Sequence, residues 1–206
     1  GTGDYDLATA YGDLYGTDET VEDVFRVQFT ATDANTMGYY YQFEGRFETG
    51  ATQDIYDAYD ALNDERFAAT FDEVRADGIE VVKFPTTVGT EDIHVIRYGE
   101  LLLILAEALV MLGGADGATA VTYLDEVRTR AGLLPYAGVV DQASVLAAIR
   151  AERRLELAFE GERWYDLVRW DMAATELTGF DAHEGLLPIP VSELDVAPNL
   201  DQNDGY

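Results

Sequence analysis

The sequence predicts a mainly α-helical fold that combines helical hairpins with long irregular loops and at most a few short strands. Apolar residues recur at helical spacing through residues 97–176, and glycines end the successive patterns. Residues 1–96, by contrast, are rich in Asp, Thr, Gly and Tyr and contain only short periodic stretches. We therefore expect a loop-rich part up to residue 96, followed by a helical scaffold.

Three short elements are expected in the loop-rich part. Residues 24–29 show mixed alternation of apolar and polar side chains, which is typical of a strand. Residues 81–85 form a second extended stretch, which a proline ends. Residues 55–62 have helical spacing, with Tyr56 and Tyr59 on one face.

The strongest helix signal lies in residues 97–112. Helical spacing places these apolar residues on one face: Leu101, Leu105, Ala108, Leu109 and Leu112. Gly113 and Gly114 end the helix, and Asp116 is expected to cap the next one, which stops at Gly132. Small residues near the turn allow close approach of the two helices, as in tetratricopeptide units. One such hairpin cannot cover its own apolar face, so it needs neighbours.

Two further helices complete the predicted scaffold. Asp141 is expected to cap a third helix that ends near Glu160, and a fourth runs from Glu162 to about Glu176. The remaining residues, 177–206, are punctuated by prolines and are expected to form an extended strap that runs back across the helices. We expect the whole of residues 1–206 to form a single domain.

Residues 150–170 differ in charge from the rest of the chain. They contain five arginines, five acidic residues and both tryptophans, and are therefore neutral, whereas the whole chain carries a net charge of −27. A solvated face of this protein would carry mainly acids, so we expect a partly buried structural ion-pair network between two helices. Its expected members are Arg153, Glu156, Glu160, Arg163, Asp166 and Arg169. An arginine cluster for an anionic ligand is the alternative.

The overall charge excludes several classes of partner. The 206 residues include 13 Lys and Arg against 40 Asp and Glu. Such an acidic protein repels phosphate backbones and anionic lipid headgroups, so neither nucleic acid nor a bare membrane surface is expected as a partner. Lys83 is the only lysine among the basic residues. This composition suggests a halophilic protein that stays soluble in concentrated salt, where screening removes self-repulsion.

Catalytic and cofactor motifs are absent from the sequence. There is no cysteine, and His94 and His183 are too far apart for a metal-ligand motif, so no metal site is expected. Neither serine lies in a nucleophile elbow, and one lysine at Lys83 rules out a phosphate-binding loop of the Walker type. We therefore expect no cofactor.

Several segments together resemble the SusD/RagB family, the surface-exposed glycan-binding lipoproteins of Bacteroidetes-type bacteria. The most specific is ERRLELAFEGERWYDLVRW at residues 152–170. The others are IRYGELLLILAEAL at 96–109, VRTRAGL at 127–133, LPIP at 187–190 with NLDQNDGY at 199–206, and IYDAY at 55–59 with DERF at 64–67. Ala197 and Asp204 depart from the family's usual Asn and Pro. Family members are also considerably longer, so the chain looks like the family's C-terminal portion.

The resemblance implies a protein that is not an enzyme. It would face outward from the cell outer membrane, held only by a lipid anchor on an N-terminal part that is not in this chain. There it would cap a SusC-like TonB-dependent transporter and deliver oligosaccharides or peptides to it. The family's helical motifs are scaffold, and its ligands contact aromatic side chains in variable loops.

The resemblance directs the search for a glycan site to the loop at residues 35–43. Three successive tyrosines there cannot all face a core. The candidate ligand-binding residues are Asn35, Tyr39, Tyr40, Tyr41 and Gln42, with Tyr11 and Tyr15 as weaker ones. Packing of the tyrosines under an N-terminal domain remains an alternative.

Two other functions remain open. The first is a tetratricopeptide-like helical scaffold that binds protein or peptide and no sugar. The second is a carboxylate-based glycoside hydrolase, although no spacing singles out an acid/base pair among the forty acids.

Overall fold

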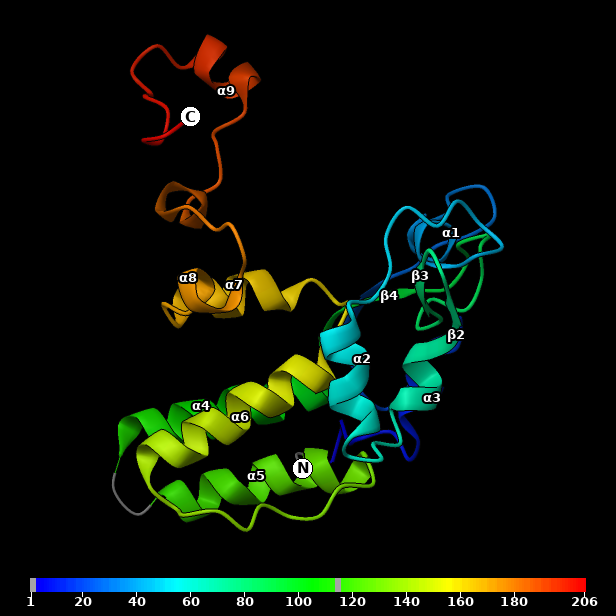
Figure 1. Ribbon diagram of the computed structural model, residues 1–206, viewed down its shortest axis with the longest axis vertical. Coiled ribbons are helices and arrows are strands. Elements are labelled where there is room, and N and C mark those ends of the chain that lie inside the picture. The colour runs from blue at the N-terminus through cyan, green and yellow to red at the C-terminus, as the bar shows by residue number, and fades with distance from the viewer. Residues whose placement is uncertain (1–2, 114–115) are drawn as a thin grey trace. The chain divides into compact units, whose positions relative to one another are not determined.

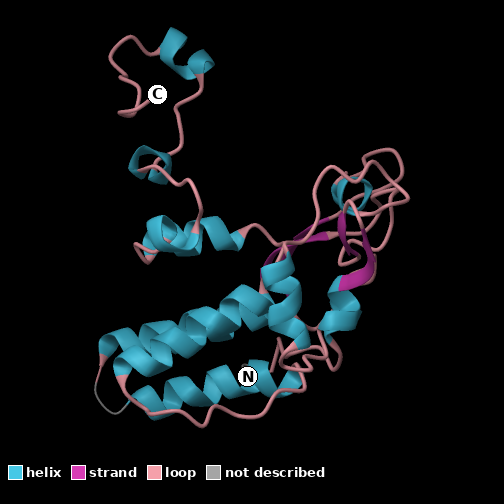
Figure 2. Cartoon of the chain, in the orientation of Figure 1, coloured by secondary structure: helices cyan, strands magenta, loops and turns pink. Residues whose placement is uncertain are grey.

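The computed structural model describes residues 3–113 and 116–206 (Figure 1). The chain divides into two compact units, Gly1–Ala158 and Phe159–Tyr206. Within the described residues, helices are the main regular structure of both units, and strands occur only as two short antiparallel pairs in the first (Figure 2). The mainly helical fold class is thus confirmed, whereas the single domain over residues 1–206 stays a prediction.

Three helices form the core of the first unit. They are α4 (Tyr98–Leu112), α5 (Asp116–Arg130) and α6 (Gln142–Glu156). Their shared apolar cluster consists of Leu102, Leu103, Ala106, Val110, Ala120, Leu124, Val127, Val145 and Ile149. Helix α6 begins as expected, because the Asp141 carboxylate accepts a hydrogen bond from the Ser144 amide at 2.9 Å. Residues 114–115 of the expected glycine turn and the side chain of Asp116 lie outside the described residues.

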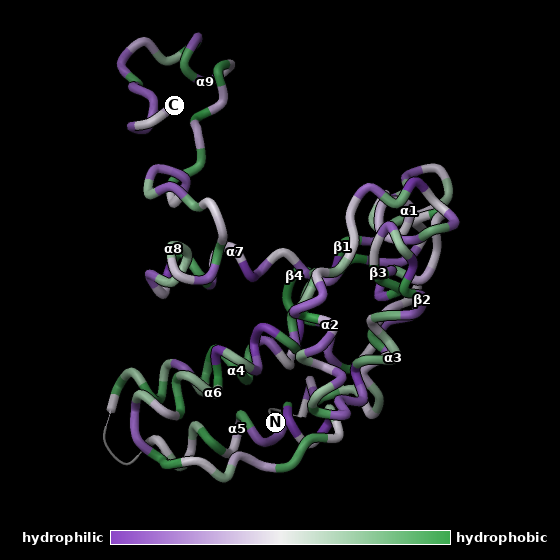
Figure 3. The backbone as a smooth tube through the Cα atoms, in the orientation of Figure 1, coloured by the Kyte–Doolittle hydropathy of each residue, from purple (hydrophilic) through white to green (hydrophobic). Residues whose placement is uncertain are grey.

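The expected apolar face of α4 is not the buried one. Leu101 and Leu105 are 37% and 41% exposed, and Leu112 is 79% exposed. The buried positions are Leu102, Leu103, Ala106 and Val110. Almost every residue of α4 after Glu100 is apolar (Figure 3). The sequence of this helix therefore contains two competing apolar stripes. The stripe that contains the small Ala106 is the one that packs against α5 and α6.

The loop-rich part of the first unit contains short elements. In chain order they are η1 (Tyr11–Leu14), β1 (Asp23–Val27), α1 (Met37–Tyr41), α2 (Gln53–Asp60), α3 (Phe67–Thr70), β2 (Phe71–Arg75), β3 (Gly78–Val81) and β4 (Ile93–Arg97). Strand β1 pairs with β4, and β2 pairs with β3, both antiparallel. The strand expected at 24–29 and the helix expected at 55–62 are confirmed to within a few residues. The extended stretch at 81–85 contributes only its first residue to a strand.

The second unit begins after α6. It contains α7 (Glu162–Arg169), α8 (Ala173–Glu176), η2 (Ala182–Gly185) and α9 (Val191–Val196). The tail is therefore less extended than expected, because two short helical segments interrupt it. Its end folds back on itself, since the Gln202 side chain accepts from the Ile189 amide at 2.8 Å and donates to the Ile189 carbonyl at 2.9 Å. The path of the tail across the helices stays a prediction.

A buried ion-pair cluster joins the loop-rich part to the helices of the first unit. Four arginines and four acids form this Glu156 cluster: Glu22, Asp64, Arg66, Arg97, Arg128, Arg130, Glu152 and Glu156. The Glu156 carboxylate contacts Arg66 at 2.8 Å, Arg97 at 2.5 Å and also Arg130. The cluster is neutral, which is what makes its burial tolerable.

Ion pairs are identified for some of the residues of the expected network. Glu156 takes its arginine partners from α3's N-terminal side, β4 and α5, and Arg153 lies 3.7 Å from Glu100 of α4. In the second unit, Asp166 pairs with Arg169 at 2.9 Å, the i,i+3 pair that the sequence indicates. The link through Glu160 and Arg163 between the two helices stays a prediction.

Candidate functional site

Helix α1 carries the three successive tyrosines. Tyr39 is exposed, whereas Tyr40 and Tyr41 are half-buried. The Tyr39 and Tyr40 rings meet edge to face at 5.6 Å between centroids, and Tyr41 stacks on Phe84 at 5.8 Å. Burial raises the pKa of the Tyr41 phenol. Tyr39 is therefore the tyrosine that can present a ring face to a ligand, while Tyr41 packs against Phe84.

The backbone before α1 is held tightly against residues 84–91. The Asn35 side chain donates to the Glu91 carbonyl at 2.8 Å and accepts from the Met37 amide at 3.0 Å. A Cβ on Gly38 would lie 2.0 Å from the Thr86 carbonyl oxygen, so only glycine permits this approach. Asn35 thus positions α1, and its amide is engaged in doing so.

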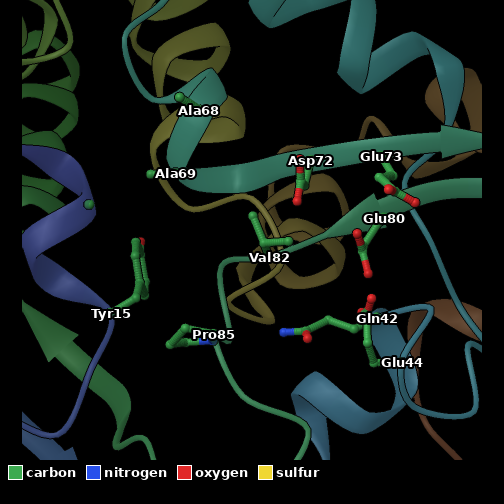
Figure 4. Close-up of a pocket in the computed structure, with 11 residues that line it drawn as sticks. Tyr15, Gln42, Glu44, Ala68, Ala69, Asp72, Glu73, Glu80, Val82 and Pro85 are labelled. Atoms are coloured by element: carbon green, nitrogen blue, oxygen red, sulfur yellow. The ribbon is translucent and has the colours of Figure 1, made fainter.

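Gln42 connects α1 to a pocket of about 480 Å³ (Figure 4). Gln42 is buried, and its side-chain amide donates to the Phe84 carbonyl oxygen. The pocket has an apolar side formed by Gly12, Tyr15, Ala68, Ala69, Val82 and Pro85. Its polar side is formed by Gln42, Glu44, Asp72, Glu73 and Glu80. One wall can therefore face a flat apolar surface while the other accepts hydrogen bonds.

The polar side of the pocket carries little positive charge. Glu44 and Glu80 point toward one another across it (Figure 4), and Glu80 accepts from the Phe43 amide at 2.7 Å. Burial raises the pKa of the Glu80 carboxyl, and the neighbouring Glu44 adds to the increase. Glu73 pairs with Arg75 at 2.7 Å. Among the described residues, no basic side chain lies within ion-pair distance of Glu44, Asp72 or Glu80.

Tyr11 and Tyr15 have different surroundings. The Tyr11 hydroxyl is buried and donates to the Glu156 carbonyl at 2.7 Å, so this residue belongs to the scaffold and not to a ligand site. Tyr15 is half-buried and lines the pocket. The Lys83 ammonium, which is fully buried, lies 4.9 Å from the Tyr15 ring centroid and donates to the Ala158 carbonyl at 2.6 Å.

Two kinds of site do not occur in the part of the chain that the structure describes. No group of three or more His, Asp or Glu side chains there is arranged to hold a metal ion. None of the helices in residues 3–113 and 116–206 has the length and apolar character needed to span a bilayer.

A family model described as the SusD family matches residues 82–185. That segment is half of the chain and includes the α4–α6 bundle. The chain belongs to the SusD family. The name of the matching family model combines SusD and RagB, so the expected SusD/RagB resemblance is confirmed.

Curated relatives and solved structures agree with the SusD family assignment. SusD-like protein P2 of Formosa agariphila is 38% identical over 54% of this chain and 25% of its own length. The starch-binding protein SusD of Bacteroides thetaiotaomicron is 29% identical over 73% of this chain and 28% of its own length. A laminarin-binding SusD-like protein superposes with a TM-score of 0.81 at 26% identity, over 98% of this chain and 54% of that one. The chain thus spans about a quarter of the two curated relatives.

The SusD family match covers only a small part of the candidate site. Residues 82–185 contain the helical bundle and, of the pocket lining, Val82 and Pro85, whereas Tyr39 and Gln42 precede the match. Of the resemblance segments outside the match, DERF supplies the buried pair of Asp64 and Arg66 at 2.6 Å. The motifs that identify the family are therefore scaffold.

Sequence reasoning missed most of the pocket lining. Glu44, Asp72 and Glu80 come from different elements, and nothing distinguishes them from the other carboxylates of an acidic chain. Of the residues that line the pocket, the sequence indicated only Gln42 and Tyr15 as candidate ligand-binding residues, because both belong to clusters of aromatic residues in the loop-rich part.

Proposed function

We propose that this chain is the glycan-binding part of a non-catalytic nutrient-binding protein. The observation that carries the proposal is the exposed Tyr39 on α1, a helix whose C-cap residue Gln42 lines a pocket with one apolar and one hydrogen-bonding wall. Membership of the SusD family supports it, as do a relative named as starch-binding and a structural neighbour named as laminarin-binding.

The chemistry of the site suits a sugar. A pyranose ring has a flat apolar face that stacks on an aromatic ring, and Tyr39 offers such a ring. Its hydroxyl groups donate to carboxylates, and the pocket supplies Glu44, Asp72 and Glu80 as acceptors. Convergent polar groups beside an apolar wall are typical of small-molecule sites. No reaction is proposed for these carboxylates.

We place the full-length protein at the outer face of the outer membrane. There it would be lipid-anchored through a part beyond this chain and would deliver its glycan to a SusC-like TonB-dependent transporter. The family assignment supports this placement, and the chain itself spans about half of the solved neighbour that binds laminarin. Expression of the full-length gene with a tagged C-terminus, followed by surface labelling and co-purification of the transporter, tests both statements.

A second candidate function follows from α4. Leu101, Ile104, Leu105 and Met111 form an exposed apolar stripe along this helix. Such a stripe suits packing against another helix, so a tetratricopeptide-like scaffold for protein or peptide remains the competing proposal.

Replacing Tyr39 with Ala is expected to weaken glycan binding about tenfold, or about 1.4 kcal/mol, because the stacking ring is lost. Calorimetry against a glycan identified on an array measures the change. Tyr165→Ala, which removes an exposed tyrosine from α7, is the matched control and should bind normally. Absence of any bound glycan, or equal affinity in Tyr39→Ala and wild type, would contradict the proposal and favour the scaffold.

We also propose a halophilic habitat, which predicts a salt-dependent stability. The net charge is −27, and the Glu156 cluster is neutral, so the excess negative charge lies outside that cluster. Screening shortens from about 10 Å at 0.1 M salt to about 3 Å at 1 M. The urea midpoint should therefore rise from 0.1 to 1 M KCl. Equal midpoints would rule out self-repulsion as a determinant of stability.

A further inference from the structure

We propose that the pocket beside α1 selects glycans by charge, admitting uncharged sugar residues and excluding those that carry a carboxylate. This inference rests on the proposed function, because it concerns which glycans the chain binds. It follows from the cavity itself, whose lining combines the Tyr15, Val82 and Pro85 wall with a carboxylate-rich wall.

The cavity has the two-sided character that an uncharged sugar requires. Tyr15, Val82 and Pro85 supply ring and aliphatic surface for the apolar face of a pyranose. On the opposite side, the carboxylates of Glu44 and Glu80 converge on the same space (Figure 4). Carboxylates are acceptors only, and the hydroxyl groups of an uncharged sugar are donors that can satisfy them.

A sugar carboxylate entering the same space would meet like charge without compensation. Arg75 is engaged with Glu73, and its guanidinium also lies 4.1 Å from the Phe43 ring centroid. Glu80 is only 3% exposed, so water screens it poorly. Two carboxylates a few ångströms apart in such surroundings repel one another strongly. The arrangement therefore penalises an anionic sugar without requiring any steric block.

Charge selection by the pocket can be distinguished from the general repulsion of anionic glycans by an acidic protein, because salt screens the two effects differently. The net charge of −27 acts over the whole surface and is screened at molar salt. Repulsion at contact distance inside a partly buried pocket is screened much less. Discrimination that persists in 1 M KCl and depends on a pocket carboxylate must therefore arise from the pocket.

The test compares one glycan backbone in two charge states. The uncharged oligosaccharide that binds tightest in an array, with laminarihexaose included, is titrated by calorimetry alongside its C6-oxidised form. Oxidation converts each primary alcohol to a carboxylate and leaves the linkages unchanged. Wild type in 1 M KCl should bind the uncharged form at least tenfold more tightly. Glu44→Gln, at an exposed position that can be replaced without disturbing the core, should reduce this ratio severalfold.

Glu126→Gln is the matched control, because it removes one carboxylate from an exposed position on α5 outside the pocket. Its ratio should equal that of wild type. Equal affinity of wild type for both forms in 1 M KCl, or equal ratios in Glu44→Gln and Glu126→Gln, would overturn charge selection while leaving glycan binding in place. No binding of any glycan would overturn the proposed function, and this inference with it.

Discussion

Replacing Glu156 with Gln is expected to lower the free energy of unfolding by about 3–5 kcal/mol, because it leaves buried guanidinium groups without their shared counter-charge. Three arginines, Arg66, Arg97 and Arg130, contact this one carboxylate. Arg66 and Arg97 are fully buried and the Arg130 side chain is only 4% exposed, so water can do little to replace the lost charge. The amide of Gln keeps the side-chain volume, so the change isolates the loss of charge. Urea denaturation followed by circular dichroism measures it.

The matched control removes a carboxylate from a surface ion pair. Asp54 of α2 pairs with Arg154, and its side chain is exposed to solvent. Asp54→Asn should therefore change the free energy of unfolding by less than about 1 kcal/mol. If Glu156→Gln and Asp54→Asn both change the free energy of unfolding by a similarly small amount, the Glu156 cluster does not stabilise the fold. If Glu156→Gln fails to fold while Asp54→Asn folds, the result agrees with the expectation.

The second large effect is a loss of stability in acid that depends on Glu156. Burial by itself would raise the pKa of this carboxyl, but the nearby guanidinium groups of Arg97, Arg130 and Arg66 outweigh it and hold the pKa well below the usual range. A group whose pKa is lowered by folding stabilises the protein above its unfolded pKa, about 4.3 for Glu. This stabilisation is lost progressively as the pH falls below that value.

Denaturation series from pH 7 to pH 3 test the acid effect. The difference in unfolding free energy between wild type and Glu156→Gln should be constant above about pH 5 and narrow below about pH 4. Glu152 acts in the opposite direction, since burial raises its pKa and its protonation therefore favours the folded state in acid. A difference that stays constant down to pH 3 would contradict the assignment to Glu156.

The helical part of the fold could be predicted from the sequence because its signals are local. Periodicity located α4, α5 and α6, and Asp141 caps α6 as expected. The orientation of α4 could not be predicted, since local spacing cannot choose between two apolar stripes on a nearly uniform helix. That choice depends on what packs against the helix, which only the tertiary structure determines.

The Glu156 cluster and the pocket could likewise be predicted only in part, because local sequence signals do not show which distant residues meet. The neutral composition of residues 150–170 indicated a buried network, yet Glu156 finds Arg66 and Arg97 at separations of 90 and 59 residues. No spacing rule links residues so far apart. The exposure of one tyrosine in α1 followed from local geometry, and Tyr39 has that position. The carboxylate wall required the pairing of β2 with β3 and the return of the chain after α1.

The burial of Lys83 has a consequence for chemical labelling. It provides the only side-chain amine of the protein, and that amine is enclosed by Tyr11, Tyr15 and the Ala158 carbonyl. Acylating reagents that modify exposed lysines would find no side-chain target in the native state. Opening of the scaffold would expose this single side-chain amine, so its rate of acylation reports how often the first unit opens.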